Sequence, residues 1–362
     1  MNQNKFIGVG LIGYGFAGKT FHAPLIRAVD GLSLQAIASS NADKVKKDFP
    51  GMPVFSNPAE MIAQDGIELI VIATPNDSHA PLARAALSAG KHVVIDKPFT
   101  LDMAEARELV AMADRQERLL SVFHNRRWDS DFLAARFGVE SGVLGQVTHF
   151  ESHIDRFRPE VRDRWRERAV PGAGVWFDLG PHMIDQALQL FGLPDGIGAN
   201  FMLQRPGAQA VDWAHVVLNY PGLRVVLHAS MIAAGGSPRF LVHGDKASLV
   251  KHGIDQQEAQ LLAGMLPGTP GWGVDPDRMQ IWNGAGECRS MPAPAGDHRR
   301  YYMAVRDFLN GTAPHAVPPI QALAVMAVLE AAMASAAGGV TMTVPLTEAE
   351  SAAFTACRNR KG

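Results

Sequence analysis

A carboxylate and an imidazole lie four residues apart in the second half of the chain, at Asp178 and His182. They follow a glycine-rich loop in a segment with helical character, where residues i and i+4 share one face. An imidazole beside a carboxylate can act as a general base near neutral pH. The alternative is structural, with Asp178 as a helix N-terminal charge and His182 as a satisfied core histidine. Asp185 continues this face, but its neighbours are apolar and we expect no metal there.

A single lysine, Lys97, closes the apolar run HVVID and precedes Pro98. A charge at the end of a buried strand is unusual for a solvated lysine. At the edge of a pocket its ammonium group could polarise a carbonyl or hydroxyl oxygen. The alternative is a surface lysine whose aliphatic stem lies along apolar side chains.

The N-terminal stretch FIGVGLIGYGFAG contains the pattern G-x-G-x-x-G between an apolar run and a helix-permissive segment. Gly13 can turn the chain tightly, Gly15 lets backbone N–H groups approach a pyrophosphate, and Gly18 lets the helix pack close to the strand. The helix N-terminus adds unpaired N–H groups and a positive dipole end. The pattern predicts a dinucleotide site whose loop comprises Gly13, Gly15, Phe16, Ala17 and Gly18.

The end of the second predicted strand, Leu32–Ser39, indicates which dinucleotide binds. NAD-binding domains place an acid about 20 residues after the glycines, on the ribose 2′-hydroxyl, and no acid stands at this strand end. Hydroxyl and amide groups can donate to a 2′-phosphate and a lysine adds charge, so the sequence favours NADP, with NAD as the alternative. The same groups can cap the next helix, and both roles can coexist. The residues concerned are Ser39, Ser40, Asn41 and Lys44.

Two further strand ends carry polar residues that could face a cofactor. A proline-stiffened turn follows the run LIVIA, and the lysine segment follows HVVID. A simple capping turn built on Asp77 or Ser78 is the alternative for the first of them. The residues we expect to contact the cofactor are Thr74, Pro75, Asn76 and His79 in the first segment, and Asp96, Lys97 and Pro98 in the second.

The order of the predicted elements defines the fold class. Up to residue 124, apolar strands alternate with helices, which predicts right-handed β-α-β units in a doubly wound parallel sheet. After residue 125, neighbouring strands lack intervening helices, which predicts an α+β domain with an open, mainly antiparallel sheet flanked by helices. We therefore expect two domains, 1–124 for the dinucleotide and 125–362 for substrate and oligomerisation. The open face of the second sheet suggests a homodimer or a dimer of dimers.

Composition excludes several classes of function. The chain has 362 residues, 47% of them hydrophobic, and a formal net charge of −2 without a Lys/Arg-rich run. This argues against nucleic acid or an anionic membrane as a partner. Two distant cysteines, Cys288 and Cys357, suggest a reducing compartment without disulfides or a zinc site. With no signal-peptide pattern and no run of 18 apolar residues, we expect a soluble cytoplasmic protein.

Polar residues at the domain junction and beyond could bind a polyhydroxylated substrate, which needs many donors and acceptors. They lie in FHNRRW, in FESHIDRFRP and beside the catalytic candidates. Individually, such residues are more often surface salt bridges or junction contacts. The residues that we expect to contact substrate are Lys97, Asn125, Arg127, His153, Asp155, Arg156, Trp176, Asp178 and His182.

Taken together, these motifs resemble the glucose–fructose oxidoreductase/inositol dehydrogenase (Gfo/Idh/MocA) family over almost the entire chain. They are GYGFAG, ATPND, VVIDKP, FHNRRW and the run from Gly174 to Asp185. The segments FHAPLI, DKPFT, FHNRRWDSDF and DRFRP look similar to the NADP-type scyllo-inositol dehydrogenase branch. One departure is Asp96, where the wider family often has Glu.

The resemblance implies a Rossmann domain followed by an open antiparallel sheet domain. It also implies that Lys97, Asp178 and His182 are the catalytic residues. The implied activity is hydride transfer between NADP(H) and a secondary alcohol or ketone of a small sugar or cyclitol. The branch does not fix the substrate, because the family is broad in its sugars and polyols. A non-catalytic NADP-binding sensor and a lyase or glycosidase that uses the nucleotide transiently are the alternatives.

Overall fold

The computed structural model describes residues 6–315 and 317–359. The chain forms two compact units, and each contains separate segments. The first holds the chain up to Asn125 together with Gln257–Trp272 and Asp297–Leu323, and the second holds the remaining segments. The prediction of two linear domains, 1–124 and 125–362, did not include these two later returns of the chain to the first unit.

The first unit is built on a parallel six-stranded sheet in the order β3-β2-β1-β4-β5-β6. β1 and β4 are apolar and buried throughout, as expected for central parallel strands. The strand order reverses between these two, and in sheets of this kind ligands bind beyond the carboxyl ends of the strands at such a point. This confirms the predicted doubly wound fold. The strands are β1 (Ile7–Ile12), β2 (Leu32–Ala38), β3 (Val54–Phe55), β4 (Leu69–Ile72), β5 (His92–Ile95) and β6 (Leu120–Val122).

Helices connect these strands, and their starts follow local capping rules. Asp102 accepts a hydrogen bond from the Glu105 N–H at the start of α5, as an N-cap residue does. Asn57 caps α3 through the Ala59 N–H in the same way. The helices of this unit are η1 (Gly18–His22), α1 (Ala23–Arg27), α2 (Ala42–Asp48), α3 (Pro58–Ile62), η2 (Asn76–Ser78), α4 (His79–Ser88), α5 (Met103–Arg115), α8 (Gln257–Leu262) and α9 (Arg299–Leu309).

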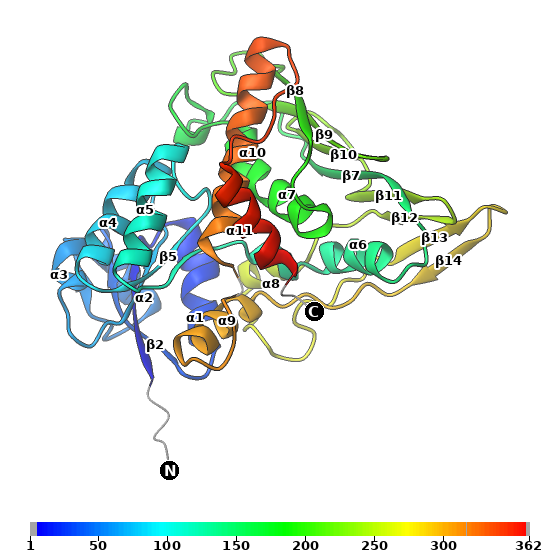
Figure 1. The fold of residues 1–362 in the computed structure, drawn as a ribbon. Coiled ribbons are helices and arrows are strands. Elements are labelled where there is room, and N and C mark those ends of the chain that lie inside the picture. Colours follow the sequence, from blue (N-terminus) through cyan, green and yellow to red (C-terminus); the bar gives the residue numbers. More distant parts are fainter. Residues whose placement is uncertain (1–5, 316, 360–362) are drawn as a thin grey trace. The chain divides into compact units, whose positions relative to one another are not determined.

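The second unit is built on an eight-stranded sheet in the order β14-β13-β12-β11-β7-β10-β9-β8 (Figure 1). All neighbouring strands pair antiparallel except β7 and β10, which run parallel. The sheet is therefore mixed and mainly antiparallel, as predicted. Its strands are β7 (Val147–Asp155), β8 (Gly196–Met202), β9 (Trp213–Tyr220), β10 (Leu223–Ser230), β11 (Phe240–Gly244), β12 (Ala247–Lys251), β13 (Met279–Asn283) and β14 (Cys288–Met291).

Helices pack on one face of this sheet. α7 (Val175–Phe191) packs on β9 and β10, and α6 (Ser130–Glu140) packs on β11 and β12. Side chains along β7 alternate accordingly, with buried Phe150 and Ile154 on the helix side. The opposite side chains of β7 point to the face that these helices leave uncovered. The remaining helical segments are η3 (Asn125–Trp128), η4 (Trp165–Glu167), α10 (Pro319–Gly338) and α11 (Glu348–Asn359).

α10 is long and apolar enough to cross a membrane by length and composition. However, 67% of its apolar window is buried inside the protein. A helix that is apolar all round and packed on several sides is typical of a protein core.

An ion pair is buried within the second unit, between Arg127 and Asp185. The Arg127 Nε–H donates to Asp185 Oδ2 at 2.8 Å, the Arg127 Nη2 group contacts the other carboxylate oxygen, and both side chains are 3% exposed. The two planar groups meet as a fork, the geometry that makes such a pair strong. Because the Asp185 carboxylate is engaged in this ion pair, Asp185 gives no support for a metal next to Asp178.

Breaking this pair on one side should destabilise the protein strongly. Arg127→Met leaves a carboxylate without its buried cation, and we expect a loss of about 3–5 kcal/mol in the free energy of unfolding, measured by urea titration. The double variant Arg127→Met/Asp185→Leu removes both charges and should recover most of that loss. A double variant as unstable as Arg127→Met would contradict this account.

Candidate active site

The glycine loop follows β1 in a conformation that requires its glycines. Gly13 has φ of 96°, and a Cβ atom there would lie 2.4 Å from the Ala73 carbonyl oxygen at the end of β4. A Cβ atom on Gly18 would lie 2.0 Å from the Gly13 carbonyl oxygen. At Gly15, by contrast, a Cβ atom would meet nothing within 4 Å. The backbone around Gly15 is therefore open, as a pyrophosphate cradle needs.

The loop after β2 lies close to this glycine turn. Lys44 Nζ donates to the Tyr14 carbonyl oxygen at 2.9 Å, so its charge reaches the chain between Gly13 and Gly15. Asn41 Oδ1 accepts from the Lys44 N–H at 3.0 Å, which confirms its capping role at α2. Ser39 Oγ accepts from the Asn41 N–H at 3.1 Å, and Ser40 is exposed. Hydroxyl, amide and ammonium groups thus gather in the segment that follows β2.

The turn after β4 is held by a buried histidine. His79 is fully buried, with Nδ1 2.9 Å from the Pro98 carbonyl oxygen and Nε2 3.1 Å from the Thr74 carbonyl oxygen. Burial lowers the pKa of His79 although Asp96 raises it, so the ring is neutral and donates to one carbonyl at a time. His79 therefore holds the loops after β4 and β5 from inside the protein, and its ring is not exposed to a ligand.

The other polar groups of this turn bond to one another. Ser78 Oγ lies 2.7 Å from Thr74 Oγ1 and 2.7 Å from the Pro75 carbonyl oxygen, and it accepts no hydrogen bond from α4. The capping alternative therefore does not hold for the Ser78 side chain. Thr74 and Pro75 are partly or fully exposed, while Asn76 is buried.

The segment after β5 presents Lys97 through a rigid arrangement. The Lys97–Pro98 peptide bond is cis, and the Lys97 N–H donates to Asp96 Oδ1 at 2.9 Å. Burial alone would raise the pKa of Asp96, but His22 and Lys97 stabilise the carboxylate and lower it overall. Asp96 is thus a charged anchor for the backbone of Lys97.

His22 and Tyr302, which the sequence analysis did not assign to the site, support this anchor. His22 Nε2 lies 3.8 Å from Asp96 Oδ1, and its Nδ1 lies 2.6 Å from the Tyr302 hydroxyl oxygen. The three groups come from η1, from the residue that follows β5 and from α9. The FHAPLI segment contained a histidine, but its partner on α9 is 280 residues away. Another predicted site residue, Asn125, is buried with its amide 3.3 Å from His298 Nδ1.

In the second unit, Asp178 and His182 both lie near the start of α7. Gly174, with φ of 91°, occupies the N-cap position, and the Asp178 N–H bonds to the Gly174 carbonyl oxygen. The Asp178 side chain is 23% exposed, whereas His182 is only 6% exposed. The predicted i, i+4 pair is therefore present on one helix, with its carboxylate nearer to solvent.

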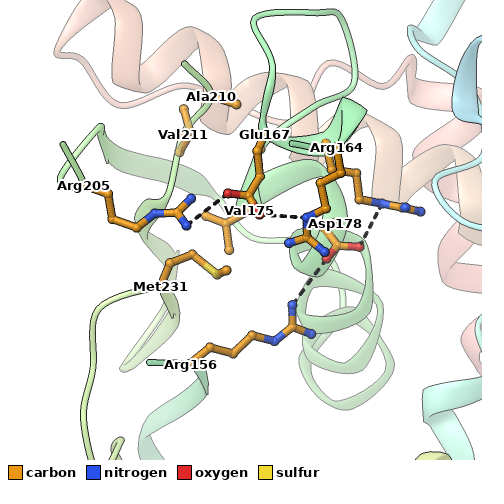
Figure 2. Close-up of a pocket in the computed structure, with 11 residues that line it drawn as sticks. Arg156, Arg164, Glu167, Val175, Asp178, Arg205, Ala210, Val211 and Met231 are labelled. Carbon is orange, nitrogen blue, oxygen red and sulfur yellow. Dashed lines mark hydrogen bonds and ion pairs between the residues drawn. The ribbon is translucent and has the colours of Figure 1, made fainter. Parts of the chain in front are cut away.

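Asp178 lines a small pocket that is open to solvent (Figure 2). Arg156 Nη1 and Arg166 Nε each lie 3.6 Å from an Asp178 carboxylate oxygen. Burial and the charges of neighbouring arginines lower the pKa of the Arg158 guanidinium nearby. This cavity therefore presents an excess of N–H donors to whatever enters it. Its lining residues include Arg156, Arg164, Arg166, Glu167, Asp178 and Arg205.

One wall of the cavity is fixed by a buried charge network (Figure 2). Glu167 accepts from Arg164 Nε at 2.7 Å and lies 3.1 Å from Arg205 Nη1. Arg205 Nε in turn donates to Asp212 Oδ2 at 3.0 Å. Although burial raises the pKa of Glu167, its hydrogen bonds and the arginine charges lower it overall. The wall is therefore ionised and rigid.

The structure places some predicted substrate residues away from this cavity. Trp176 is buried, and its indole N–H donates to the Leu329 carbonyl oxygen at 3.2 Å, which is a packing role. Arg127 is held in its ion pair with Asp185. His153 and Asp155 alternate with the buried side of β7, so they lie on the face opposite α7, whereas the next residue, Arg156, reaches Asp178.

Comparisons with known proteins identify the family. Residues 7–124 match the model described as "Oxidoreductase family, NAD-binding Rossmann fold", and residues 138–346 match "Oxidoreductase family, C-terminal alpha/beta domain". The chain belongs to the Gfo/Idh/MocA family of oxidoreductases. It is therefore an NAD(P)-dependent oxidoreductase, which confirms the resemblance found in the sequence.

Individual relatives support the same assignment. The chain is 51% identical to "Uncharacterized oxidoreductase YdgJ" of Escherichia coli K12, over 91% of this chain and 96% of that protein. It is 37% identical to "scyllo-inositol 2-dehydrogenase (NADP(+)) IolW" of Bacillus subtilis 168, over 91% and 93% respectively. The crystal structure of an oxidoreductase from Klebsiella pneumoniae matches with a TM-score of 0.93 and 55% identity, over 98% of this chain and 99% of that one.

Two glycine variants should separate folding from cofactor binding. Gly13→Ala forces a Cβ atom into a left-handed conformation and against Ala73, and we expect it to lower the free energy of unfolding by about 1–3 kcal/mol. Gly15→Ala has room for its methyl group and should leave the melting temperature unchanged. Because that methyl group would enter the predicted pyrophosphate cradle, dinucleotide binding measured by nucleotide fluorescence should weaken at least about tenfold, or 1.4 kcal/mol. Unchanged binding by Gly15→Ala would place the pyrophosphate elsewhere.

Proposed function

We propose that this protein transfers hydride between NADP(H) and a secondary alcohol or ketone of a sugar or cyclitol. The observation that carries the proposal is Asp178, four residues before His182 on α7 and lining an arginine-rich cavity. N–H donors suit a substrate with many oxygen acceptors. The 37% identical relative from Bacillus subtilis, named as a scyllo-inositol 2-dehydrogenase, supports the substrate class.

The acid–base chemistry falls to this chain's own residues. When bound, the nicotinamide ring accepts or supplies the hydride. In the oxidation direction His182 removes the hydroxyl proton, and Asp178 stabilises the charged imidazole that results. Lys97, held by its backbone bond to Asp96, stabilises the developing alkoxide with its ammonium group. In the reduction direction His182 returns the proton to the carbonyl oxygen.

NADP is proposed as the preferred dinucleotide. The support is the absence of an acid at the end of β2 and the presence there of Ser39, Ser40 and Asn41. Lys44, fixed on the Tyr14 carbonyl, adds a positive charge beside the glycine turn. A carboxylate in this place would repel a 2′-phosphate, whereas these groups can bind it.

We also propose a cytoplasmic homo-oligomer that associates through the uncovered face of the second sheet. Cys288 and Cys357 form no disulfide, which fits a reducing compartment. The face of the sheet opposite α6 and α7 carries no helix from those two elements. A second copy would cover the side chains that remain exposed there.

The central test is absorbance at 340 nm with NADP and NAD against inositols, aldoses and their keto forms. We expect NADP-dependent turnover with at least one polyol. Lys97→Met and His182→Ala should each lower kcat by about 10²–10⁴-fold and retain NADPH binding by fluorescence. Matched controls are the variants Lys46→Met and His252→Ala, which change exposed residues and should keep full activity.

Three results would contradict this function. Full activity of Lys97→Met or His182→Ala would remove the assigned roles. No absorbance change across the panel would favour the non-catalytic sensor. A cleaved product without net change in the cofactor's redox state would favour the lyase or glycosidase alternative.

The dinucleotide preference has its own test. Ser40→Asp places a carboxylate where a 2′-phosphate is proposed, and we expect about tenfold weaker NADPH binding, roughly 1.4 kcal/mol, with NADH binding unchanged or tighter. Lys46→Gln changes the net charge by the same amount at an exposed position of α2 and serves as the control. If the unmodified protein binds NADH more tightly than NADPH, the proposed preference is wrong.

A further inference from the structure

A row of imidazoles crosses three strands on the face of the second sheet opposite α7. His153 on β7 is the register partner of His228 on β10, and His228 is the partner of His215 on β9. Register partners in neighbouring strands point to the same face. The ring centroids of His153 and His228 are 5.3 Å apart, and those of His228 and His215 are 5.5 Å apart. The sheet geometry thus brings these imidazoles together from distant parts of the chain.

Asp155 joins two of these histidines in a compact cluster. One nitrogen of His153, one nitrogen of His228 and one oxygen of Asp155 lie within 4.8 Å of one another. The distance between His228 Nε2 and Asp155 Oδ1 is 3.8 Å, too long for a hydrogen bond. The three side chains are 13%, 15% and 4% exposed, in the order His153, His228, Asp155. Three ligand-type atoms therefore face one sheltered point.

Two polar atoms of this cluster are buried and lack a hydrogen-bond partner among the described residues. They are His153 Nδ1 and Asp155 Oδ1. The other carboxylate oxygen, Asp155 Oδ2, accepts from the Ser237 N–H at 3.0 Å, so the side chain is held in place. A buried acceptor without a partner costs free energy, and a bound cation would satisfy both atoms together.

Glu151 holds His153 in the tautomer that a metal ligand needs. Glu151 Oε2 lies 2.7 Å from His153 Nε2, and Oε1 lies 2.7 Å from His149 Nε2. A carboxylate oxygen accepts in such a hydrogen bond, so the histidine nitrogen that faces it is the donor. His153 Nε2 therefore carries the proton and donates it to Glu151, which leaves the lone pair on Nδ1. A carboxylate behind a ligand histidine is the usual outer support of a protein-bound metal.

His228 is also held by a hydrogen bond through the ring nitrogen that faces away from the cluster. Its Nδ1 lies 3.4 Å from His215 Nδ1, so one of the two nitrogens donates to the other. When His228 Nδ1 is the donor, its Nε2 lone pair points toward the cluster with Asp155. Neutral imidazole is the form that binds metals.

We propose that His153, Asp155 and His228 form a binding site for a divalent transition metal of the zinc type. Two imidazoles and one carboxylate are a common protein ligand set for this ion. Tetrahedral coordination at about 2.1 Å places ligand atoms about 3.4 Å apart. The separation of 3.8 Å between His228 Nε2 and Asp155 Oδ1 is close to this value, and all three atoms lie within 4.8 Å of one another. The ion would tie β7 to β10, the one parallel strand pair of this sheet among the described residues. The site lies on the opposite face of the sheet from α7 and takes no part in the proposed hydride transfer.

Cobalt and zinc binding to the full chain, without an affinity tag and after treatment with a chelator, tests this proposal. We expect Co²⁺ to give visible d–d absorption that saturates at one equivalent per chain and is displaced by Zn²⁺. His228→Ala and the isosteric Asp155→Asn should each weaken binding at least about 100-fold. Glu151→Gln, which disturbs the support of His153 and the contact with His149 but removes no proposed ligand, should weaken binding by about 10–100-fold.

A matched control uses another histidine of the same face. His243 on β11 contacts Ser248 Oγ at 2.7 Å and stacks on His149, outside the proposed ligand set. His243→Gln should therefore bind metal like the unmodified protein. Circular dichroism of each variant verifies folding, and Asp155→Asn keeps the test decisive if His228→Ala fails to fold. The proposal is overturned if the chelator-treated chain binds no stoichiometric Co²⁺ or Zn²⁺. It is also overturned if His243→Gln loses as much affinity for the metal as the ligand variants do.

Discussion

The close approach of two backbone segments, at Gly13 and Ala73, is the constraint on which the cofactor side of this protein depends. A Cβ atom at Gly13 would lie 2.4 Å from the Ala73 carbonyl oxygen. The chain can therefore turn at the end of β1, next to β4, only if glycine occupies position 13. The strand order reverses between these two strands, which makes their carboxyl ends the natural place for a ligand. The open space around Gly15 follows from the same turn. The close approach at Gly13 and the open backbone at Gly15 thus lie within one short turn.

Buried histidines hold the loops at the neighbouring strand ends in place. His79 lies between the carbonyls of Thr74 and Pro98 and so joins the loops after β4 and β5. His22 lies between Tyr302 and Asp96, and Asp96 accepts from the Lys97 N–H. These imidazoles are buried and face backbone or protein groups. Their role is to hold the loops that follow β4 and β5, and the second of these loops carries Lys97.

The sequence predicted the parts of the molecule whose signals are local and repetitive. Alternating apolar strands and helices indicated the doubly wound sheet, and the four-residue spacing placed Asp178 and His182 on one helix. β3 and α3 are two and five residues long, too short for a periodic pattern. The return of α8 and α9 to the first unit has no local signal, because only tertiary packing determines it. For the same reason, Tyr302 could not be linked to His22.

The clearest difference between prediction and structure arises on one strand, and its cause is the two-residue period of β-structure. The segment FESHIDRFRP looked like one group of polar substrate contacts. In the structure, Arg156 reaches Asp178 beside α7, while His153 and Asp155 point to the opposite face and meet His228. Applying strict alternation to the sequence would have separated these residues. Finding His228 would still have required the register of β7 and β10, which no short pattern encodes. Neighbouring residues of this segment therefore belong to two separate groups of polar side chains, because consecutive side chains of β-structure point to opposite faces of the sheet.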